Sequence, residues 1–307
     1  MKTSPIIRVD FSIGFGNNLF QFTYAKLLAE KIGAKIYILP PSGDYFGIDS
    51  LDLLVSDEVL SLDTPITVIT NFQKAEEIFS NNLSTDTIIT EKDAKNILHN
   101  PENKNYILRG YFEDYTLYEN DLEKIRGWFI KPPDKNKDDV ILHLRLGDRL
   151  FIKGTYDPEA LLTFERYQNG LSQINFNKLH IVSDLPSKII NSRGSVTAQD
   201  LLETEYHTHL ENDSIEMAEK AAKYVNELIG KFSNNYKTNF WNQGLDRDFQ
   251  RIMWHDKIIF GYSTFAWWAA TLSGSSQVGV FKPWRPMKKT GNKNLGQTNY
   301  PGWFGWS

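Results

Sequence analysis

The sequence predicts an α/β fold built as two domains with a cleft between them, and three observations favour this class. Apolar runs of strand length alternate with segments of helical periodicity in both halves of the chain. The stretch 131–139 is rich in Lys, Asp and Pro and lacks periodicity, which indicates a linker. Polar residues follow several predicted strands, where open α/β sheets bind ligands. We therefore expect an N-terminal α/β domain over residues 1–135 and a second domain over residues 136–307.

The first domain opens with a predicted strand–helix–strand unit. Alternating apolar residues predict a strand from Ile6 to Phe11, followed by a glycine turn from Gly14 to Gly16. An apolar stripe at helical spacing predicts a helix from Leu19 to Ile32, with Gly33 as its C-terminal stop. A second strand is expected from Lys35 to Leu39.

The remainder of this domain is less regular. Short helices are expected at Asp49 to Leu62 and at Gln73 to Phe79, and a further helix at Leu122 to Trp128. A strand is expected from Tyr106 to Tyr111, and it runs into the aromatic and acidic segment 111–115. Asp10, Glu113 and Asp114 are candidates for a general base on residue type alone.

The second domain repeats the alternation of strands and helices. The expected strands are Val140 to Leu144, Leu179 to Val182, Lys257 to Phe260 and Val278 to Phe281. The expected helices are Ile215 to Ile229, Asp246 to Trp254 and Phe265 to Leu272. This pattern predicts a second parallel sheet.

The composition excludes several classes of protein. The chain has 307 residues, 41% hydrophobic and 23% charged, enough for a packed core in each of two domains. Its net charge of -4 argues against a nucleic-acid partner. The absence of cysteine excludes disulfides, thiol nucleophiles and cysteine metal sites. With no apolar signal core or membrane span in the sequence, we expect a cytoplasmic protein without an integral membrane segment, and peripheral membrane contact stays open.

The segment from His143 to Asp148 carries the first candidate site. Strand alternation places His143 and Arg145 on one face and Leu144 and Leu146 on the other. An Arg at a strand end suits a pyrophosphate and stabilises charge on a leaving phosphate. The alternative is an Arg–Asp pair that fastens the loop, with His143 as a hydrogen-bonded core residue.

Two further strand ends carry polar residues. Ser183 and Asp184 suit a ribose or a base edge, and the alternative is a helix cap or a turn. Ser263 and Thr264 precede a helix, where hydroxyls and N–H groups form a phosphate cradle. The alternative is a Ser/Thr cap on a core helix, with Trp267 and Trp268 as core packing.

The turn from Gly14 to Asn17 is a weaker candidate. It lacks the third Gly of the dinucleotide fingerprint and the Lys-Ser/Thr of a P-loop. It is either a tight turn that presents Asn17 to the cleft or an ordinary strand-to-helix turn. His207 and His209 have metal-ligand character without an evident third ligand, so no metal site is assigned.

Taken together, these segments resemble glycosyltransferase family 11, the α-1,2-fucosyltransferases, within the wider fucosyltransferase group that carries His-x-Arg-x-x-Asp. The N-terminal segment Gly14-Phe15-Gly16-Asn17-Asn18-Leu19-Phe20-Gln21-Phe22 is similar to the family's Gly-Leu-Gly-Asn-Gln-Met-Phe-Gln-Tyr. The other matching segments are His143-Leu144-Arg145-Leu146-Gly147-Asp148, Ser183-Asp184, Ser263-Thr264-Phe265-Ala266-Trp267-Trp268-Ala269-Ala270 and Lys282-Pro283-Trp284.

The resemblance implies a GT-B fold, in which two Rossmann-like domains face each other across a cleft. It implies an inverting transfer of L-fucose from GDP-fucose to a hydroxyl of a glycan acceptor, such as O2 of a terminal galactose. The donor is held by the C-terminal domain and the N-terminal domain lies on the acceptor side, with neither a metal nor a cofactor besides the GDP-sugar donor.

The resemblance also implies roles for individual residues. Arg145 contacts the β-phosphate and stabilises the departing GDP, and His143 and Asp148 shape its loop. The other implied contacts are Ser183 and Asp184 near guanosine, Ser263 and Thr264 near the diphosphate, and Gly16 and Asn17 on the side of the sugar or acceptor.

The chain also departs from the family pattern. Leu146 replaces a second Arg, Tyr262 replaces an Asn, and Ala266 replaces a Ser. These departures leave the sugar open, so another GDP-hexose such as GDP-rhamnose and a non-catalytic carbohydrate-binding protein remain alternatives. A sulfotransferase is disfavoured because no P-loop-like segment lies near the N-terminus.

Overall fold

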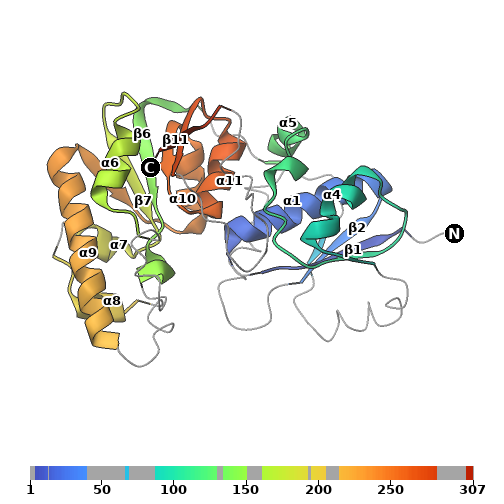
Figure 1. Cartoon of the computed structure of the whole chain (residues 1–307), viewed down its shortest axis with the longest axis horizontal. Helices are drawn as coiled ribbons and strands as arrows, with labels where there is room; N and C mark the ends of the chain where they lie inside the picture. Colours follow the sequence, from blue (N-terminus) through green and yellow to red (C-terminus); the bar gives the residue numbers. More distant parts are fainter. Residues whose placement is uncertain are drawn as a thin grey trace. The chain divides into compact units, whose positions relative to one another are not determined.

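The computed structural model describes residues 4–12, 14–39, 66–68, 87–129, 134–150, 161–192, 195–204, 214–281 and 302–306. These residues form two compact units, unit 1 up to residue 129 and unit 2 from residue 134 (Figure 1). Each unit contains one parallel β-sheet with helices packed against it. The chain is therefore an α/β protein with two parallel sheets, as the alternation of strand and helix patterns predicts.

The sheet of unit 1 has the strand order β3-β2-β1-β5-β4, and every pair of neighbours is parallel. Strands β2 and β3 extend from one side of β1, whereas β5 and β4 extend from the other. The strand order therefore reverses between β1 and β5, the position where open sheets bind ligands. The strands are β1 (Ile6–Asp10), β2 (Lys35–Leu39), β3 (Ile66–Val68), β4 (Thr87–Ile89) and β5 (Tyr106–Leu108).

Helix α1 (Phe15–Ile32) begins four residues before the predicted start at Leu19. Gly14, with φ of 95°, is the one glycine of this segment that lies in the turn. The predicted extension of the turn to Gly16 is therefore wrong. Gly16 and Asn17 lie in the first helical turn. Most residues of α1 are buried, including polar ones. Tertiary packing therefore stabilises a helix whose first residues have the sequence pattern of a loop. Gly33 ends the helix in the left-handed conformation, as predicted.

The described part of unit 1 contains three shorter helices. They are α4 (Glu91–His99), the 3₁₀ turn η1 (Tyr115–Leu117) and α5 (Leu122–Arg126). Strand β5 ends at Leu108, so its predicted extension to Tyr111 is wrong, and the segment 109–114 is a loop. The helices predicted within 49–62 and 73–79 lie outside the described residues.

The sheet of unit 2 has the order β11-β10-β9-β6-β7-β8, and every pair of neighbours is again parallel. Three strands extend in sequence order on each side of the boundary between β6 and β9, which is the doubly wound Rossmann arrangement. The strands are β6 (Asn136–Leu144), β7 (Leu179–Ser183), β8 (Thr238–Trp241), β9 (His255–Phe260), β10 (Gln277–Phe281) and β11 (Phe304–Trp306).

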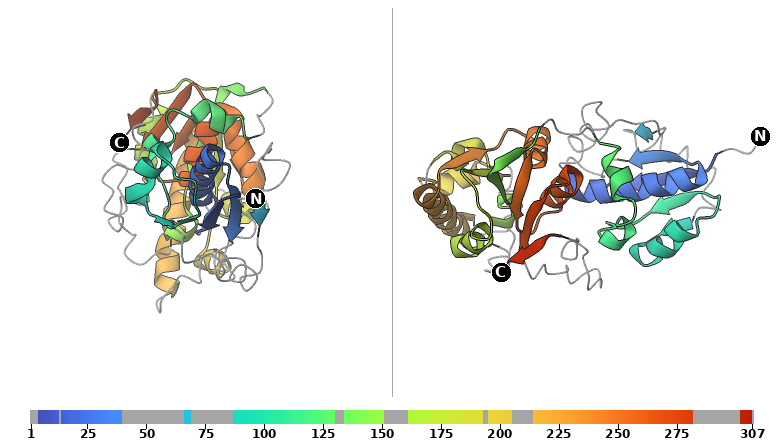
Figure 2. Two further views of the ribbon diagram at one scale, coloured as in Figure 1. Left: turned by 90° about the vertical axis from the view of Figure 1, so that its right-hand side faces the viewer. Right: turned by 90° about the horizontal axis from the view of Figure 1, so that it is seen from above.

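Helices cover both faces of this sheet (Figure 2). Leu142 and Leu144 of β6 share a core cluster with side chains of α6 and α9, whereas α10 and α11 lie on the other face. The helices are α6 (Phe164–Leu171), α7 (Ser187–Ile190), α8 (Ala198–Leu202), α9 (Ser214–Asn235), α10 (Leu245–Met253) and α11 (Thr264–Ser273), with a 3₁₀ turn, η2 (Gly147–Leu150). The strands and helices predicted for this half are confirmed.

Strand β6 starts earlier than predicted. Residues 136–139 belong to β6, so the assignment of the whole stretch 131–139 to a linker is wrong. The Asn136 N–H donates to the Trp254 carbonyl at 2.7 Å, and the register with β9 shifts between Asn136 and Val140. The residues at this irregularity are polar, so this part of β6 lacks the apolar pattern from which a buried strand is predicted.

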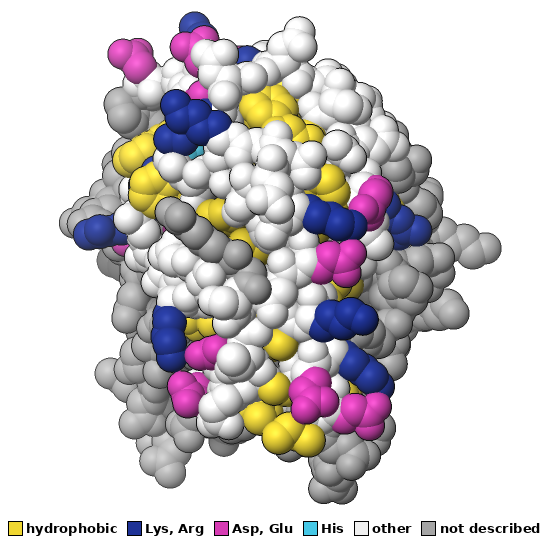
Figure 3. Space-filling model, turned by 90° about the vertical axis from the view of Figure 1, so that its left-hand side faces the viewer, with side chains coloured by type: hydrophobic (Ala, Val, Ile, Leu, Met, Phe, Trp, Pro, Cys, Tyr) yellow, Lys and Arg dark blue, Asp and Glu magenta, His cyan; other side chains and the backbone are white. Residues whose placement is uncertain are grey.

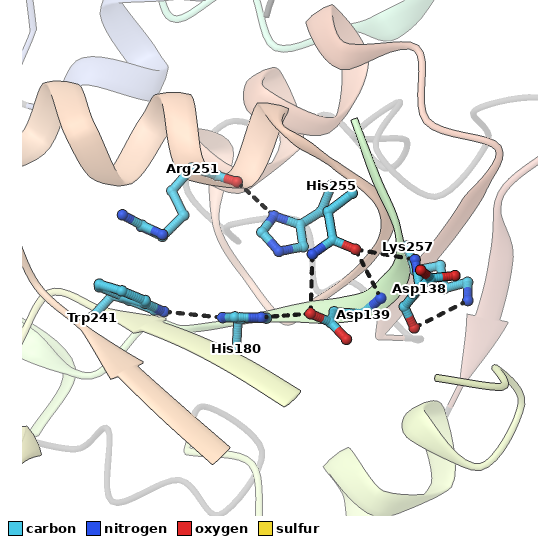
Figure 4. Close-up of polar contacts among 8 residues, drawn as sticks. Asp138, Asp139, His180, Trp241, Arg251, His255 and Lys257 are labelled. Atoms are coloured by element: carbon cyan, nitrogen blue, oxygen red, sulfur yellow. Dashed lines mark hydrogen bonds and ion pairs between the residues drawn. The ribbon is translucent and has the colours of Figure 1, made fainter. Parts of the chain in front are cut away.

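A polar network crosses the sheet of unit 2 near the amino ends of β6 and β7 (Figure 4). The Trp241 Nε1–H donates to His180 Nδ1 at 3.2 Å, and His180 Nε2 lies 3.0 Å from Asp139 Oδ2. Because indole can only donate, His180 carries its proton on Nε2 and donates to the carboxylate. The Arg251 guanidinium stacks 3.6 Å from the centroid of the Trp241 ring. This network lies away from the ligand-binding edge and holds the strands together.

The surface of unit 2 mixes charges of both signs (Figure 3). Lys231 on α9 pairs with Glu227 and with Glu165 of α6, at 3.0 and 2.6 Å. Such exposed pairs contribute little to stability. None of the helices within the described ranges combines the length and the apolar character needed to cross a bilayer.

Gly33, which ends α1, and Gly230, which lies within α9, allow a paired test of how backbone conformation affects stability. Gly33 has φ of 65°, so Gly33→Ala is expected to lower the free energy of unfolding by about 1–2 kcal/mol. Gly230 lies within α9 with open space at its Cβ position, so Gly230→Ala is expected to raise it by roughly 0.5–1 kcal/mol. Urea unfolding of the whole chain measures both changes, and equal signs would contradict the left-handed assignment.

Candidate functional site

Three loops meet at the carboxyl edge of the sheet in unit 2. Arg145 follows β6, Asp184 follows β7, and Ser263 and Thr264 follow β9 at the start of α11. Strands β9, β6 and β7 are neighbours and parallel, so these loops leave the sheet at the same edge. The structure therefore brings together the polar strand ends that the sequence analysis singles out, at the reversal of strand order between β6 and β9.

The Asp184 carboxylate holds the loop that follows β6. Its Oδ1 accepts the backbone N–H groups of Leu146 and Gly147 at 2.8 and 2.9 Å. Its Oδ2 pairs with Arg145 Nη1 at 2.5 Å. The Arg–Asp pair offered as an alternative by the sequence is thus present, with its carboxylate supplied by the neighbouring strand. Asp184 connects β7 to the loop after β6 and fixes the direction of the Arg145 side chain.

Arg145 remains accessible within this arrangement. Its side chain is 36% exposed, compared with 16% for Asp184. A guanidinium has five N–H donors in a rigid fork, so an ion pair through Nη1 is compatible with a second anionic partner. The carboxyl edge of unit 2 therefore presents a fixed, partly exposed cation.

His143 is a neutral core residue beside this cation. It is buried, and its ring centroid lies 5.6 Å from that of Phe265 on α11. Burial lowers the pKa of His143 to about 4, with the Asp184 carboxylate opposing and Arg145 reinforcing the shift. Its Nδ1 has no hydrogen-bond partner among the described residues, so the alternative of a hydrogen-bonded core histidine is wrong at that atom. At neutral pH, His143 packs without adding charge.

Ser263 is the N-cap of α11. Its Oγ accepts the Ala266 N–H at 3.2 Å, which confirms the cap alternative for this residue. Thr264 is the first helical residue, and the first turn carries no acidic side chain. The positive end of the helix dipole is therefore not neutralised by a carboxylate of that turn. Trp267 and Trp268 are fully buried, as core packing requires.

Ser183 stabilises the turn after β7. It is buried, and its Oγ accepts the Leu185 N–H at 3.3 Å, so the turn alternative is confirmed for this residue. Asp184 does not cap a helix, because Pro186 occupies the N-cap of α7. Asp148 lies in η2, and its side chain is outside the described residues, as are His207 and His209.

Gly16 and Asn17 lie in unit 1, at the start of α1. The Asn17 backbone N–H donates to the Gly14 carbonyl at 3.1 Å. They therefore occupy the carboxyl edge of the sheet in unit 1, next to the end of β1.

Gln21, a residue without a predicted role, organises that same edge. Its Nε2 donates to the carbonyls of Asp10 and Gly110 at 3.1 and 3.0 Å. Its Oε1 accepts the N–H of Ser12 at 2.9 Å. Gln21 thus joins the loops that follow β1 and β5, where the strand order of unit 1 reverses. The only sequence signal is its place in the segment that resembles a family motif.

The described part of the chain holds no group of three or more His, Asp or Glu side chains arranged to hold a metal ion.

Comparison with known proteins yields a weak structural likeness. No model of a protein family matches the chain, and no curated protein matches it. Among solved structures, the chain is similar to a point variant of Arabidopsis thaliana FUT1 in complex with GDP, with a TM-score of 0.45 and 8% identity. The match covers 91% of this chain and 70% of that one. A likeness at this level shows nothing about the function of this chain.

Asp184 allows a direct test of the loop. Asp184→Ala leaves the N–H groups of Leu146 and Gly147 without their acceptor, and is expected to lower the free energy of unfolding by about 2–4 kcal/mol. Asp184→Asn keeps one carbonyl oxygen as an acceptor for these N–H groups. It should therefore lower the free energy of unfolding by less than half as much as Asp184→Ala. Urea unfolding measures both variants, and equal losses would show that Asp184 acts only through the Arg145 ion pair.

His143 makes a contribution to stability that depends on pH. In the unfolded chain its pKa is near 6.5, compared with about 4 in the fold. Below pH 6.5 the unfolded chain binds a proton that the folded chain excludes, so stability falls between pH 6.5 and 4 and then levels off. His143→Leu removes this pH dependence. Between pH 7 and 5, its free energy of unfolding should therefore fall by about 2 kcal/mol less than that of the wild type. His255, whose pKa burial also lowers to about 4, is present in both proteins and cancels. Parallel losses would show that His143 is protonated in the fold.

Proposed function

We propose that this protein is an inverting, metal-independent glycosyltransferase that moves L-fucose from GDP-fucose to a glycan hydroxyl, in the first instance O2 of a terminal galactose. One observation carries the proposal: Arg145 and the N-terminus of α11 lie at the ends of two adjacent parallel strands, at the β6/β9 reversal. A diphosphate is the ligand that matches a rigid cation beside a helix N-terminus.

The chemistry of the leaving group explains this choice of residues. When the bond from the sugar C1 to the phosphate oxygen breaks, negative charge develops on GDP. Arg145 and the helix dipole of α11 offset that charge, and groups already held in place do so without reorganisation. A divalent metal supplies the same stabilisation in other transferases, and in this proposal the cation and the helix terminus replace it.

The other candidate residues support the donor in different ways. Asp184 acts through Arg145, because its oxygens already accept from Arg145 and from two backbone N–H groups. Ser183 shapes the adjacent turn for the guanosine, and Thr264 lies on the diphosphate side of α11. His143 and Asp148 shape the loop that carries Arg145, and in unit 1 Gly16 and Asn17 belong to the sugar or acceptor side.

The identity of the sugar is the less constrained part of the proposal. Arg145 and the terminus of α11 recognise a diphosphate and are indifferent to the hexose. Tyr262, where the family pattern has Asn, packs edge-on against Phe281 at 5.4 Å, and Ala266 is fully buried. GDP-rhamnose and a non-catalytic site are therefore tested alongside GDP-fucose.

The direct test is calorimetric titration with GDP, UDP and ADP in the presence of EDTA. Selective binding of GDP is expected, followed by transfer of fucose from GDP-fucose to lactose under the same conditions. Transfer only from GDP-rhamnose would change the sugar, and GDP binding without any turnover would favour a binding protein. Activity that EDTA abolishes and Mn²⁺ restores would contradict the metal-independent mechanism.

Arg145→Ala is expected to lower the rate of transfer by about two to three orders of magnitude, since one key donor to the leaving group is lost. Lys237→Ala is the matched control, because Lys237 is an exposed cation preceding β8 at the opposite end of the sheet. Initial rates with GDP-fucose and lactose measure both variants. Near-normal turnover in Arg145→Ala would remove Arg145 from the mechanism.

A further inference from the structure

The first turn of α6 lies at the carboxyl edge of the sheet in unit 2. Thr163 caps this helix, since its Oγ1 accepts the Arg166 N–H at 3.4 Å. The Arg166 guanidinium lies 5.5 Å from the ring centroid of Phe281, the last residue of β10. A Cβ at Gly170 would come within 2.8 Å of the Trp306 ring, so this glycine allows α6 to pack closely on β11. These contacts fix α6 against β10 and β11.

Tyr167 extends from this turn toward the loop that follows β9. Its ring packs on Trp306 and Phe232 at centroid distances of 5.6 and 6.0 Å, and the residue is 3% exposed. Its hydroxyl lies beside Gly261, the first residue after β9, where a Cβ would be 3.6 Å from the hydroxyl oxygen. Because Gly261 has no side chain, the hydroxyl lies next to the backbone of this loop, two residues before Ser263, the N-cap of α11.

The Tyr167 hydroxyl makes no hydrogen bond to any residue that the structure describes. Buried tyrosine hydroxyls generally have a partner. Elsewhere in the chain, the hydroxyls of Tyr24, Tyr118 and Tyr224 donate to main-chain carbonyls at 3.0, 2.6 and 2.9 Å. The phenol of Tyr167 therefore holds a hydrogen that is not donated to the described part of the protein.

The groups around this hydroxyl keep it protonated. Burial raises the pKa of Tyr167 above its usual value, and the Asp184 carboxylate and the Tyr262 phenol reinforce the shift. The oxygens of Asp184 already accept from Arg145 and from two backbone N–H groups. Tyr167 thus adds a neutral O–H donor near the pair that Arg145 and Asp184 form.

Donors of three kinds lie at this edge of unit 2. They are the guanidinium of Arg145, the N–H groups at the start of α11 and the phenol of Tyr167. A phosphate oxygen accepts hydrogen bonds from each of these groups, and it favours the positive end of a helix and a guanidinium. The ligand class that matches a buried phenol in this position is therefore a phosphate ester.

We propose that the Tyr167 hydroxyl donates a hydrogen bond to a phosphate oxygen of the nucleoside diphosphate that binds at this edge. The identity of the nucleotide rests on the proposed function, whereas the contact itself is with the diphosphate. Packing on Trp306 and Phe232 holds the phenol in place before the ligand binds. A donor held in this way loses little conformational freedom on binding, which favours affinity.

The test compares Tyr167→Phe with Tyr224→Phe. Each variant loses one hydroxyl and keeps its ring, and Tyr224 is the matched control because its hydroxyl already donates to the Leu162 carbonyl. Affinities for GDP and for inorganic pyrophosphate are measured by calorimetry in the presence of EDTA. Tyr167→Phe is expected to weaken both by about 10–100-fold, the range for a hydrogen bond to a charged group. Tyr224→Phe should leave both affinities within twofold of the wild type.

The melting temperature separates a ligand contact from a structural role. Without ligand, Tyr167→Phe should melt at or above the wild-type temperature, because the hydroxyl that it loses has no partner among the described residues. Tyr224→Phe should melt at a lower temperature, since it leaves the Leu162 carbonyl without its donor. At one concentration of GDP, the rise in melting temperature should be smaller for Tyr167→Phe than for the wild type.

The outcomes distinguish the two proposals. If Tyr167→Phe binds GDP and pyrophosphate within twofold of the wild type, the contact is overturned while the proposed transfer stands. A lower melting temperature of unliganded Tyr167→Phe shows a structural hydroxyl and overturns the contact as well. If Tyr167→Phe weakens pyrophosphate binding but the wild type neither prefers GDP nor transfers fucose, the contact stands and the proposed function fails. A wild type that binds neither GDP nor pyrophosphate defeats both.

Discussion

At the carboxyl edge of each sheet, where the strand order reverses, one polar side chain binds the backbone of loops from neighbouring strands. Asp184 performs this role in unit 2, where it accepts two N–H groups of the loop after β6. Gln21 performs it in unit 1, where it binds the loops after β1 and β5. Backbone groups beyond the end of a β-ladder need other partners, and supplying both from one side chain fixes the loops relative to each other. The geometry of Arg145 in unit 2, and of the loops after β1 and β5 in unit 1, depends on these contacts.

The carboxyl edges of the two sheets carry different charged groups. The edge of unit 2 presents Arg145 beside the positive end of α11, and His143 is kept neutral by burial, so its charge is that of the guanidinium and its carboxylate partner. The edge of unit 1 gathers Glu91, Glu113 and Asp114, and the pKa of Glu113 is raised to about 7. Group transfer to a hydroxyl needs one environment that stabilises a departing anion and one that accepts a proton.

The fold was largely predictable from the sequence because parallel strands buried on both faces are near-continuous apolar runs, as in Ile141 and Leu142 of β6. The Ser263 cap was predictable because its hydrogen bond to the Ala266 N–H is local. The pairing of Arg145 with Asp184 was not, since it spans 39 residues and depends on which strands are neighbours. The start of α1 was missed because Gly14 and Gly16 look equivalent in sequence, whereas only Gly14 has positive φ. The environment of Glu113 was invisible because it arises from α4, the backbone of Phe112 and the turn at Tyr118.

The polar side chains at the two ends of the unit 2 sheet are held in different ways. Near the amino ends, His180 is hydrogen-bonded through both nitrogens, to Trp241 and to Asp139, so its polar atoms are satisfied and the residue serves cohesion. At the carboxyl edge of unit 2, the buried imidazole of His143 has no partner at Nδ1 among the described residues. Burial of groups left in this state costs free energy. Unsatisfied buried atoms occur at both ends of the unit 2 sheet, since Nε2 of His255 at the start of β9 has no partner among the described residues either. The candidate site is therefore identified by the partly exposed Arg145 guanidinium that Asp184 holds in place, and not by unsatisfied atoms alone.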